Sequence, residues 1–241
     1  PFIDIYPKVI ADFILDTDRG CTPLTVNFAN SSTGLGSYTW DFGNGMRSTE
    51  TSPQGIGFIN TSKDNLATYT VWLKSKNAIG CSDSISRTIT VNPKVEAAFT
   101  WDKTDGCSPV NISFNNTSTS ALYQYSWNFG DGSPTTNDEQ PGMHTYTNSG
   151  LTIQNPTVTL VTQYKDDTSC ADTLELPLSI YPRIYPDFTY NPTGCTPHLV
   201  QFINQTQSFS ANNQYVWNLG NGNYAYSANV EQEYRNTSTQ N

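Results

Sequence analysis

The chain has 241 residues, a formal net charge of −9 and a sequence pI near 4.5. So acidic a composition argues against binding nucleic acid or anionic lipid, which both require clustered cations. No apolar run approaches the roughly 18 residues of a membrane span. The sequence starts at Pro1 without a signal-peptide pattern, so we expect a mature, processed or fragmentary chain. Abundant Thr (32 residues) and Tyr (14 residues) favour strands over helices.

The sequence repeats itself three times. A Gly-Cys-Thr/Ser-Pro segment occurs at 20–23, 106–109 and 194–197, with spacings of 86 and 88 residues. A second motif, from a tyrosine through tryptophan to Gly-x-Gly, occurs at 38–45, 125–132 and 215–222. Two motifs that share one period indicate an array of similar domains.

Short strand-like runs that end in proline and a basic residue separate the repeats. They predict the last strand of an earlier repeat at 1–7, complete repeats at 8–93 and 94–182, and a third repeat at 183–241. The third repeat stops before any equivalent of Tyr69–Leu73 or Cys81, so we expect both ends to be cut from a longer array.

Hydrophobic side chains alternate with polar ones within each repeat. Leu24, Val26 and Phe28 form one such row, and Tyr38, Trp40 and Phe42 form another. A period of two predicts strands with one buried face. Asn-Gly and Asp-Gly pairs after each second row predict hairpin turns, because these residues tolerate positive φ. The pattern predicts an all-β chain of sandwich domains without helices.

The run Trp-Asp-Phe-Gly-Asn-Gly at 40–45 resembles the signature of the polycystic kidney disease (PKD) domain. The runs at 127–132 and 217–222 resemble it too, as do Pro23–Phe28 and Tyr69–Leu73. The resemblance implies tandem immunoglobulin-like (PKD-type) β-sandwich domains in an elongated, extracellular array. The cysteine pattern is similar to that of giant surface proteins of Bacteroidetes, including gliding-motility adhesins.

The five cysteines follow the repeats. Cys21 and Cys81 lie in repeat 1, and Cys107 and Cys170 lie in repeat 2. We therefore predict one disulfide within each complete repeat, with Cys195 unpaired by truncation. A zinc site is the alternative, but neither close cysteine pairs nor nearby histidines favour it.

Three further side chains are candidate contact or modification sites. Ser84 and Thr173 lie in Asp-Ser/Thr-aliphatic triplets that are similar to the O-glycosylation sites of Bacteroidetes. The alternative is that each aspartate ends a turn before the last strand. Trp72 is out of phase with its strand, so we expect it to face outward, where it could contact a sugar, a neighbouring domain or solvent alone.

No pattern of catalytic residues recurs, and we expect a protein that is not an enzyme. His144 and His198 fall on expected strands, and the Gly-x-Gly turns precede no helix that would bind phosphate. Acidic pairs near strand ends, such as Asp16 with Asp18 and Asp102 with Asp105, leave calcium as an alternative to a solvated surface. We expect no cofactor.

These observations predict a stalk or spacer segment of a large adhesin at the cell surface, serving adhesion or gliding motility. Its partners would be neighbouring repeats of the same chain and surface polysaccharide or other cell-surface proteins, without nucleic acid or membrane insertion. One alternative is a carbohydrate-binding accessory module of a secreted hydrolase. Another is a surface-layer or filament subunit in which residues 1–7 donate a strand to the third repeat of a second molecule.

Overall fold

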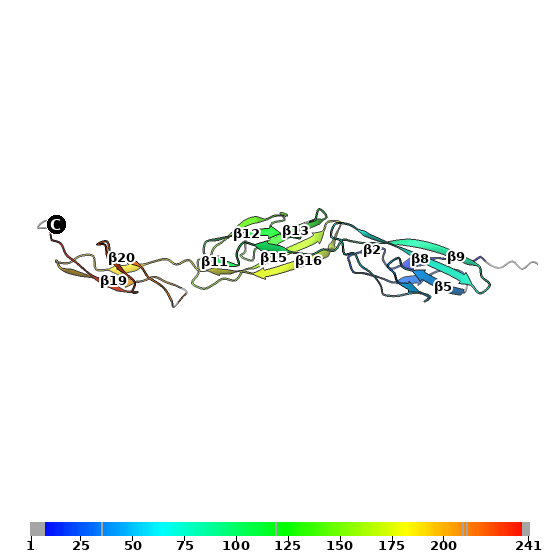
Figure 1. The fold of residues 1–241 in the computed structure, drawn as a ribbon, viewed down its shortest axis with the longest axis horizontal. Coiled ribbons are helices and arrows are strands. Elements are labelled where there is room, and N and C mark those ends of the chain that lie inside the picture. Colours follow the sequence, from blue (N-terminus) through cyan, green and yellow to red (C-terminus); the bar gives the residue numbers. More distant parts are fainter. Residues whose placement is uncertain (1–7, 35, 119, 209, 211, 238–241) are drawn as a thin grey trace, which may run out of the picture.

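The computed structural model describes residues 8–237 except 35, 119, 209 and 211. The strand predicted at 1–7 lies outside this range. The described residues form strands, turns and irregular segments without a helix, so the all-β prediction is confirmed, and none of them builds a helix that could cross a membrane. Figure 1 shows three bodies placed end to end in chain order along one long axis.

Repeat 1 is a sandwich of nine strands. They are β1 (Phe13–Leu15), β2 (Arg19–Gly20), β3 (Leu24–Val26), β4 (Phe28–Asn30), β5 (Gly36–Asp41), β6 (Arg47–Ser48), β7 (Ile56–Phe58), β8 (Ala67–Asn77) and β9 (Ser82–Val91). The larger sheet has the order β2-β9-β8-β5-β6, and the pairs β1-β4 and β3-β7 lie across the core from it. In this sheet β2 runs parallel to the end of β9, whereas β8 and β9 form a long antiparallel hairpin.

Repeat 2 repeats this arrangement with eight strands. They are β10 (Phe99–Trp101), β11 (Asp105–Cys107), β12 (Val110–Asn116), β13 (Tyr123–Asn128), β14 (Gly142–Tyr146), β15 (Thr157–Tyr164), β16 (Asp167–Pro177) and β17 (Ser179–Tyr181). The sheets β10-β12-β14 and β13-β15-β16 enclose the core, and β11 runs parallel to β17. Two antiparallel sheets around one core form an immunoglobulin-like β-sandwich.

Repeat 3 has five described strands. They are β18 (Phe188–Tyr190), β19 (His198–Asn204), β20 (Trp217–Asn218), β21 (Tyr224–Ala225) and β22 (Val230–Tyr234). The order β18-β19-β22 matches β10-β12-β14 of repeat 2, and β20-β21 is a short hairpin. Among the described residues no strand of repeat 3 corresponds to β15 or β16, and the inner face of this sheet is open.

Each of the first two repeats encloses its own hydrophobic core around a tryptophan. Trp40 and Trp127 are fully buried, and each packs edge-on against the phenylalanine of the repeat's first strand. Burial of an indole N–H requires a hydrogen-bond acceptor. Trp40 Nε1 donates to the Glu50 carbonyl (2.9 Å), and Trp127 Nε1 donates to the Asp138 carbonyl (3.1 Å). Trp40 and Trp127 are therefore core residues, and their rings are not exposed for binding a ligand.

The residues after each tryptophan form the predicted tight turn. Gly43 and Gly45 have φ of +71° and +89°, which residues with a Cβ rarely adopt. The Asp41 carboxylate accepts the N–H of Gly43, and the Asn44 side chain accepts the N–H of Met46. The Asp/Asn-x-Gly-x-Gly motif therefore forms two consecutive turns, and in each of them a side-chain oxygen accepts a backbone N–H.

Replacing the buried Trp40 by alanine is expected to destabilise repeat 1 by about 3–5 kcal/mol, because it leaves a large cavity and removes an anchored N–H. Trp72 lies in the same sheet but is 50% exposed. Trp72→Ala is therefore expected to change the free energy of unfolding by no more than about 0.5 kcal/mol. Urea unfolding of both variants, followed by circular dichroism, measures the two changes. Equal losses would contradict the assignment of Trp40 to the core.

Candidate functional site at the junction between repeats 1 and 2

A disulfide crosses the junction between the first two repeats. It joins Cys21 of repeat 1 to Cys170 of repeat 2, which are 149 residues apart in sequence, with a Cα–Cα distance of 5.3 Å. The prediction of one disulfide within each repeat is therefore wrong. Cys81, Cys107 and Cys195 are exposed free thiols, so Cys195 alone keeps the unpaired state that was predicted for it.

The length of the sandwich explains why the predicted pairing fails. Gly20 pairs with Val91 at the end of β9, whereas Cys81 lies just before the start of that strand. At about 3.3 Å per residue the two cysteines of repeat 1 lie roughly 33 Å apart. A disulfide requires Cα atoms within about 7 Å of each other. Cys107 pairs with Tyr181 and is separated from Cys170 in the same way.

The last strand of repeat 1 positions Cys21 at the end of the sandwich that faces repeat 2. The Gly20 carbonyl accepts the N–H of Asn92 (2.8 Å), and the hydroxyl of Thr22 accepts the N–H of Asn60 (2.8 Å). A Cβ on Gly20 would come within 2.7 Å of the Leu24 side chain. A residue larger than glycine at this position would therefore require the end of the Leu24 side chain to shift.

The hairpin β15-β16 carries Cys170 to the same place from the other side. Its register shifts between Gln163 and Tyr164, where the turn begins. Asp167 Oδ1 accepts hydrogen bonds from both the N–H and the hydroxyl of Ser169 (3.2 and 2.6 Å). These bonds fix the hairpin tip, and Cys170 is only 4% exposed in the junction.

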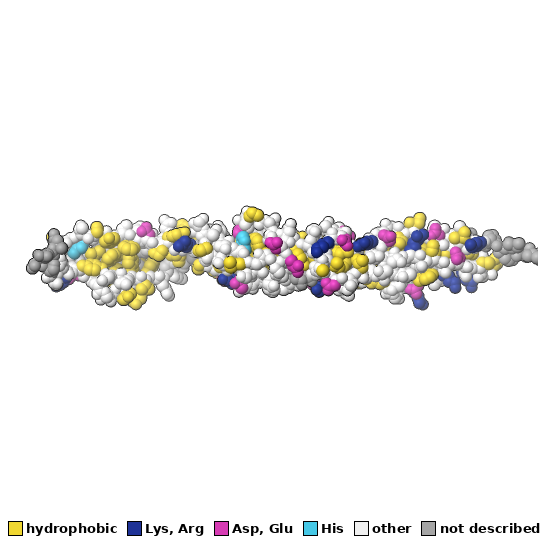
Figure 2. All heavy atoms as spheres, turned by 90° about the horizontal axis from the view of Figure 1, so that it is seen from above, with side chains coloured by type: hydrophobic (Ala, Val, Ile, Leu, Met, Phe, Trp, Pro, Cys, Tyr) yellow, Lys and Arg dark blue, Asp and Glu magenta, His cyan; other side chains and the backbone are white. Residues whose placement is uncertain are grey.

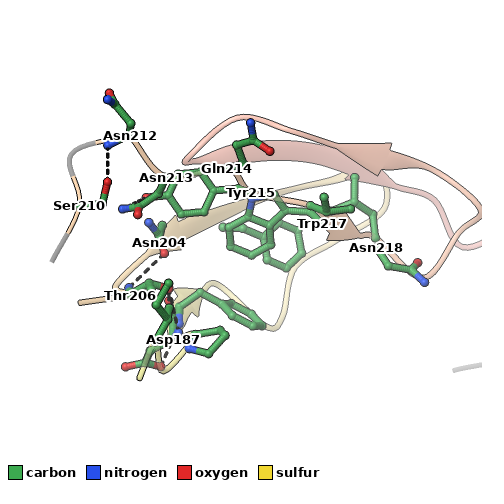
Figure 3. Close-up of a pocket in the computed structure, with 16 residues that line it drawn as sticks. Asp187, Asn204, Thr206, Ser210, Asn212, Asn213, Gln214, Tyr215, Trp217 and Asn218 are labelled. Atoms are coloured by element: carbon green, nitrogen blue, oxygen red, sulfur yellow. Dashed lines mark hydrogen bonds between the residues drawn. The ribbon is translucent and has the colours of Figure 1, made fainter. Parts of the chain in front are cut away.

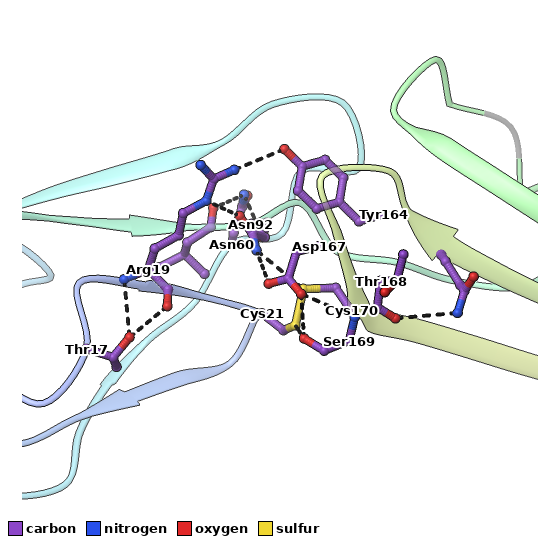
Figure 4. The surroundings of a disulfide bond; sticks show 12 residues. Thr17, Arg19, Cys21, Asn60, Asn92, Tyr164, Asp167, Thr168, Ser169 and Cys170 are labelled. Carbon is purple, nitrogen blue, oxygen red and sulfur yellow. Dashed lines mark hydrogen bonds between the residues drawn. A yellow bond between two sulfur atoms is a disulfide. The ribbon is translucent and has the colours of Figure 1, made fainter.

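Polar side chains from both repeats surround the disulfide, as Figure 4 shows. The fully buried Asn92 of repeat 1 donates from Nδ2 to Asp167 Oδ2 (2.9 Å) of repeat 2. Arg19 Nε donates to Asn92 Oδ1 (3.0 Å), and Arg19 also donates to the Tyr164 hydroxyl (3.3 Å) across the junction. Because a buried amide must satisfy its donors and acceptor, this network fixes how the repeats meet.

A second set of contacts lies where the linker enters repeat 2. The Lys94 N–H donates to the Ser62 carbonyl (2.8 Å), and the Tyr123 hydroxyl donates to the Lys94 carbonyl. Burial and nearby carboxylates raise the pKa of Tyr123 to about 12, so this hydroxyl keeps its proton at neutral pH. The Ser120 hydroxyl donates to the Lys63 carbonyl of repeat 1 (3.1 Å). The linker is therefore hydrogen-bonded on both sides of Pro93.

One cluster among the described residues has the composition of a metal site. The ligating atoms of Cys21, Asp167 and Cys170 all lie within 4.8 Å of one another. The two sulfurs are bonded to each other, and a disulfide supplies no thiolate for a metal. In this oxidised form the cluster offers a metal only one carboxylate, and that carboxylate already accepts hydrogen bonds from Asn92 and Ser169.

At least one aspartate of each pair considered for calcium has a structural partner. Asp16 Oδ1 accepts the N–H of Asn27 (2.9 Å), and Asp102 Oδ1 accepts the N–H of Ser113 (2.9 Å). In repeat 3 Asn191 makes the equivalent bond to Gln201. Since the uncharged Asn191 amide accepts the same hydrogen bond, this position requires a hydrogen-bond acceptor and does not require a negative charge. The backbone N–H of Asn27 also lowers the pKa of Asp16.

The triplets considered for glycosylation also have a structural explanation. Asp83 Oδ2 accepts the N–H of Ala11 (2.9 Å), and Asp172 Oδ2 accepts the N–H of Ala97 (2.8 Å). The Ala11 bond lowers the pKa of the Asp83 carboxyl. Each aspartate thus ties the first segment of its repeat to the last hairpin. The hydroxyl-bearing residues that follow, Ser84 and Thr173, are exposed, and their modification stays a prediction.

Trp72 lies on the outer face of the larger sheet of repeat 1 and is 50% exposed. It borders a shallow depression of about 310 Å³, whose lining includes Asp41, Arg47 and Lys74. The strand registers place Thr159 at the equivalent position of repeat 2, because Asp41 pairs with Trp72 and Asn128 pairs with Thr159. The aromatic side chain therefore does not recur between these repeats.

The two histidines have structural contacts on their predicted strands. His144 stacks on Phe129 with 4.0 Å between ring centroids, and its Nε2 lies 2.8 Å from Asp131. His198 Nε2 lies 3.2 Å from the Asn191 carbonyl. Burial alone would raise the pKa of Asp131, but hydrogen bonds from His144 and Ser133 lower it overall. Neither histidine stands beside a serine or cysteine nucleophile in these contacts.

The open face of repeat 3 forms a hollow among the described residues. Its volume is about 590 Å³, and Phe188, Phe202 and Trp217 form its apolar floor. Figure 3 shows asparagine and glutamine side chains at one rim, and Figure 2 shows the hydrophobic patch over this body. In repeat 2 the equivalent rings are covered by β15 and β16. The hollow therefore lies where β15 and β16 cover the core of repeat 2.

The disulfide assignment predicts a definite thiol count. Mass spectrometry of peptides released without reductant is expected to find Cys21 linked to Cys170, with Cys81, Cys107 and Cys195 reactive toward a thiol reagent. The strand lengths are the physical reason, since the alternative pairs cannot reach each other. Peptides linking Cys21 to Cys81 and Cys107 to Cys170, with Cys195 alone reactive, would contradict the assignment.

Comparisons with known proteins bear on this geometry. A model of the PKD domain family matches residues 90–177. The PKD1 domain of Vibrio anguillarum Epp is 34% identical over 36% of this chain and 96% of its own length (TM-score 0.29). The PKD1 domain of the Vibrio cholerae metalloprotease PrtV is 33% identical over 36% and 99% (TM-score 0.29). The ICAM-5 D1–D4 ectodomain fragment is 11% identical over 94% and 75% (TM-score 0.38). The chain thus contains a PKD domain at residues 90–177.

Proposed function

We propose that this chain is a load-bearing spacer of an extracellular protein, built from tandem PKD-type repeats. The observation that carries the proposal is the Cys21–Cys170 disulfide between two end-to-end repeats. A spacer has to keep its length and direction under tension. A covalent bond across the junction and a buried polar network beside it supply both properties.

The disulfide changes the path that tension follows through the chain. Force applied along the chain reaches Cys21, crosses to Cys170 and leaves through the end of β16 and through β17. The segment 22–169 between the two cysteines, which includes most of both cores, lies outside this covalent path. The core strands β3 to β9 and β10 to β15 can therefore be relieved of load while the bond is intact.

The compartment follows from the same bond. Disulfides persist in oxidising environments outside the cytosol, and an extracellular location fits both the disulfide and the PKD domain. Within that setting the finer proposal is a stalk at the cell surface that presents an adhesive domain, as in gliding-motility adhesins. Negative charge and polar outer faces support it, because they keep an extended rod hydrated and separate.

Pulling the chain by its two ends is expected to show a length that depends on the disulfide. At about 3.5 Å per extended residue, the bond hides roughly 520 Å of contour length. Single-molecule force spectroscopy under oxidising conditions should lack this extension, and adding reductant should release it.

The matched control is Cys21→Ser, which should release the extension without reductant. The same length gain in the oxidised chain and in this variant would contradict the load path. Because the variant changes one partly exposed side chain at the end of the sandwich, both repeats are expected to keep their folds.

The second candidate function is a carbohydrate-binding module, favoured by the exposed Trp72 and the depression beside it. An aromatic ring next to Arg47, Asp41 and Lys74 could stack on a sugar whose hydroxyls bond the charged groups. Glycan-array binding that is lost in Trp72→Ala and kept in Cys21→Ser would favour this function over the spacer. The absence of an equivalent ring at Thr159 favours the spacer.

A further inference from the structure

We propose that the Cys21–Cys170 bond is one link of a repeating ladder. We call Cys21, Cys107 and Cys195 the early cysteines of their repeats, and Cys81 and Cys170 the late cysteines. In this ladder the early cysteine of each repeat bonds the late cysteine of the repeat that follows. Cys81 then forms a disulfide with the cysteine in the Gly-Cys-Thr/Ser-Pro loop of a preceding PKD-type repeat. Cys107 forms a disulfide with a late cysteine in the completed third repeat, and Cys195 forms one with a late cysteine of the repeat after that. The inference rests on the proposed array but makes a separate statement about its covalent structure.

The loops that carry the early cysteines are built alike. Cys21 follows a strand parallel to β9, and Cys107 ends a strand parallel to β17. The hydroxyl after the cysteine accepts the N–H of an asparagine in each repeat: Thr22 from Asn60, Ser108 from Asn148 and Thr196 from Asn236, at 2.8, 2.7 and 3.0 Å. Asn60 and Asn148 in turn donate to the carbonyl of the paired last strand. The structure therefore presents Cys107 as it presents Cys21.

The hairpins that carry the late cysteines share one anchoring contact. Cys81 and Cys170 each lie two residues before the aspartate that accepts an alanine N–H from the first segment of the repeat. Cys81 sits in the turn between β8 and β9, where its N–H donates to Asn77 Oδ1 (2.9 Å). This turn lies at the end of repeat 1 that faces away from repeat 2, as the β15-β16 tip faces away from repeat 3 (Figure 1).

The two cysteine positions lie at opposite ends of repeats 1 and 2, so within this chain a bond between an early and a late cysteine requires neighbouring repeats. Roughly 33 Å of strand separates them within repeat 1. The three cysteines without a bonded neighbour, Cys81, Cys107 and Cys195, are all exposed, whereas Cys170 is buried once it is bonded. The exposed thiols are thus accessible to a cysteine of a neighbouring repeat.

The charged residue beside the early cysteine differs between repeats and would select the partner. Arg19 reaches Tyr164, whose hydroxyl donates to Asp166 (3.0 Å), so repeat 1 meets an acidic hairpin. The equivalent residue in repeat 2 is Asp105, which accepts from the Tyr181 hydroxyl (3.2 Å). The hairpin that bonds Cys107 should therefore carry a cation or a neutral donor where repeat 2 has Asp166.

Each link forms by thiol–disulfide exchange with an external disulfide oxidant. Two cysteine thiols lose two protons and two electrons and form one S–S bond. The oxidant, oxidised glutathione in the experiment below, is reduced to two thiol molecules.

The first test adds a copy of residues 8–93 in place of 1–7 in the full chain. In the added copy Cys81→Ser removes its own late cysteine, and Thr22→Ser marks its early-cysteine peptide by mass. In glutathione buffer we expect a bond between the marked Cys21 and the original Cys81, beside the intact Cys21–Cys170 bond. Cys107 and Cys195 should stay reactive. A control copy that also carries Cys21→Ser should leave Cys81 reactive.

The second test completes repeat 3 by joining a copy of residues 149–182 after Asn236, with Asp166→Asn in the copy to supply the neutral donor opposite Asp105. We expect the copied Cys170 to bond Cys107, and Cys107→Ser should leave it free. A bond from the copied Cys170 to Cys195 instead would overturn the ladder, because it would be a link within one repeat. Free cysteines in both extended chains would overturn it as well. Neither result would affect the load path across the first junction, which the force experiment on the unextended chain tests.

Discussion

The distance between the two ends of a β-sandwich controls the covalent structure of this chain. In repeat 1 the late cysteine precedes β9 and the early cysteine lies beside the end of that strand, so about ten residues of extended backbone separate them. Extended backbone cannot fold back to close this gap. A cysteine pair that would staple a compact domain in another fold therefore serves here to staple one domain to the next. The bond between neighbouring repeats and the proposed tensile path both follow from this constraint.

The junction combines this covalent bond with a buried polar network rather than an apolar interface. Asn92 is fully buried and uses its side-chain amide in both directions, toward Arg19 and toward Asp167. Apolar surfaces would tolerate sliding, because the hydrophobic effect is non-directional. Hydrogen bonds with fixed donors and acceptors allow one orientation, so the network sets the angle between the repeats and the disulfide prevents their separation.

The fold could be predicted from the sequence because its signals are local. Alternation around Trp40 and the glycines at 43 and 45 act within a few residues, and the structure contains the predicted strands and turn there. The disulfide could not be predicted in this way, because sharing a repeat says nothing about distance. The missing signal was the position of Gly20 beside the last strand, which only the parallel pairing of β2 and β9 reveals. Similarly, the triplet at Asp83 resembled a modification site, although its carboxylate also holds the Ala11 backbone.

Repetition gives such a junction a property that an isolated disulfide lacks. When each repeat bonds the next through cysteines at opposite ends, successive loops overlap, since Cys107 lies inside the loop closed by Cys21 and Cys170. The shortest covalent path then passes from Cys170 to Cys195 and skips most of every domain. Unfolding one core under tension would lengthen such an array very little, because the unfolded residues lie within a loop that a disulfide closes and do not carry the tension. A stalk can then be built from domains of ordinary stability, since its extension is limited by covalent bonds and its direction by the buried amides.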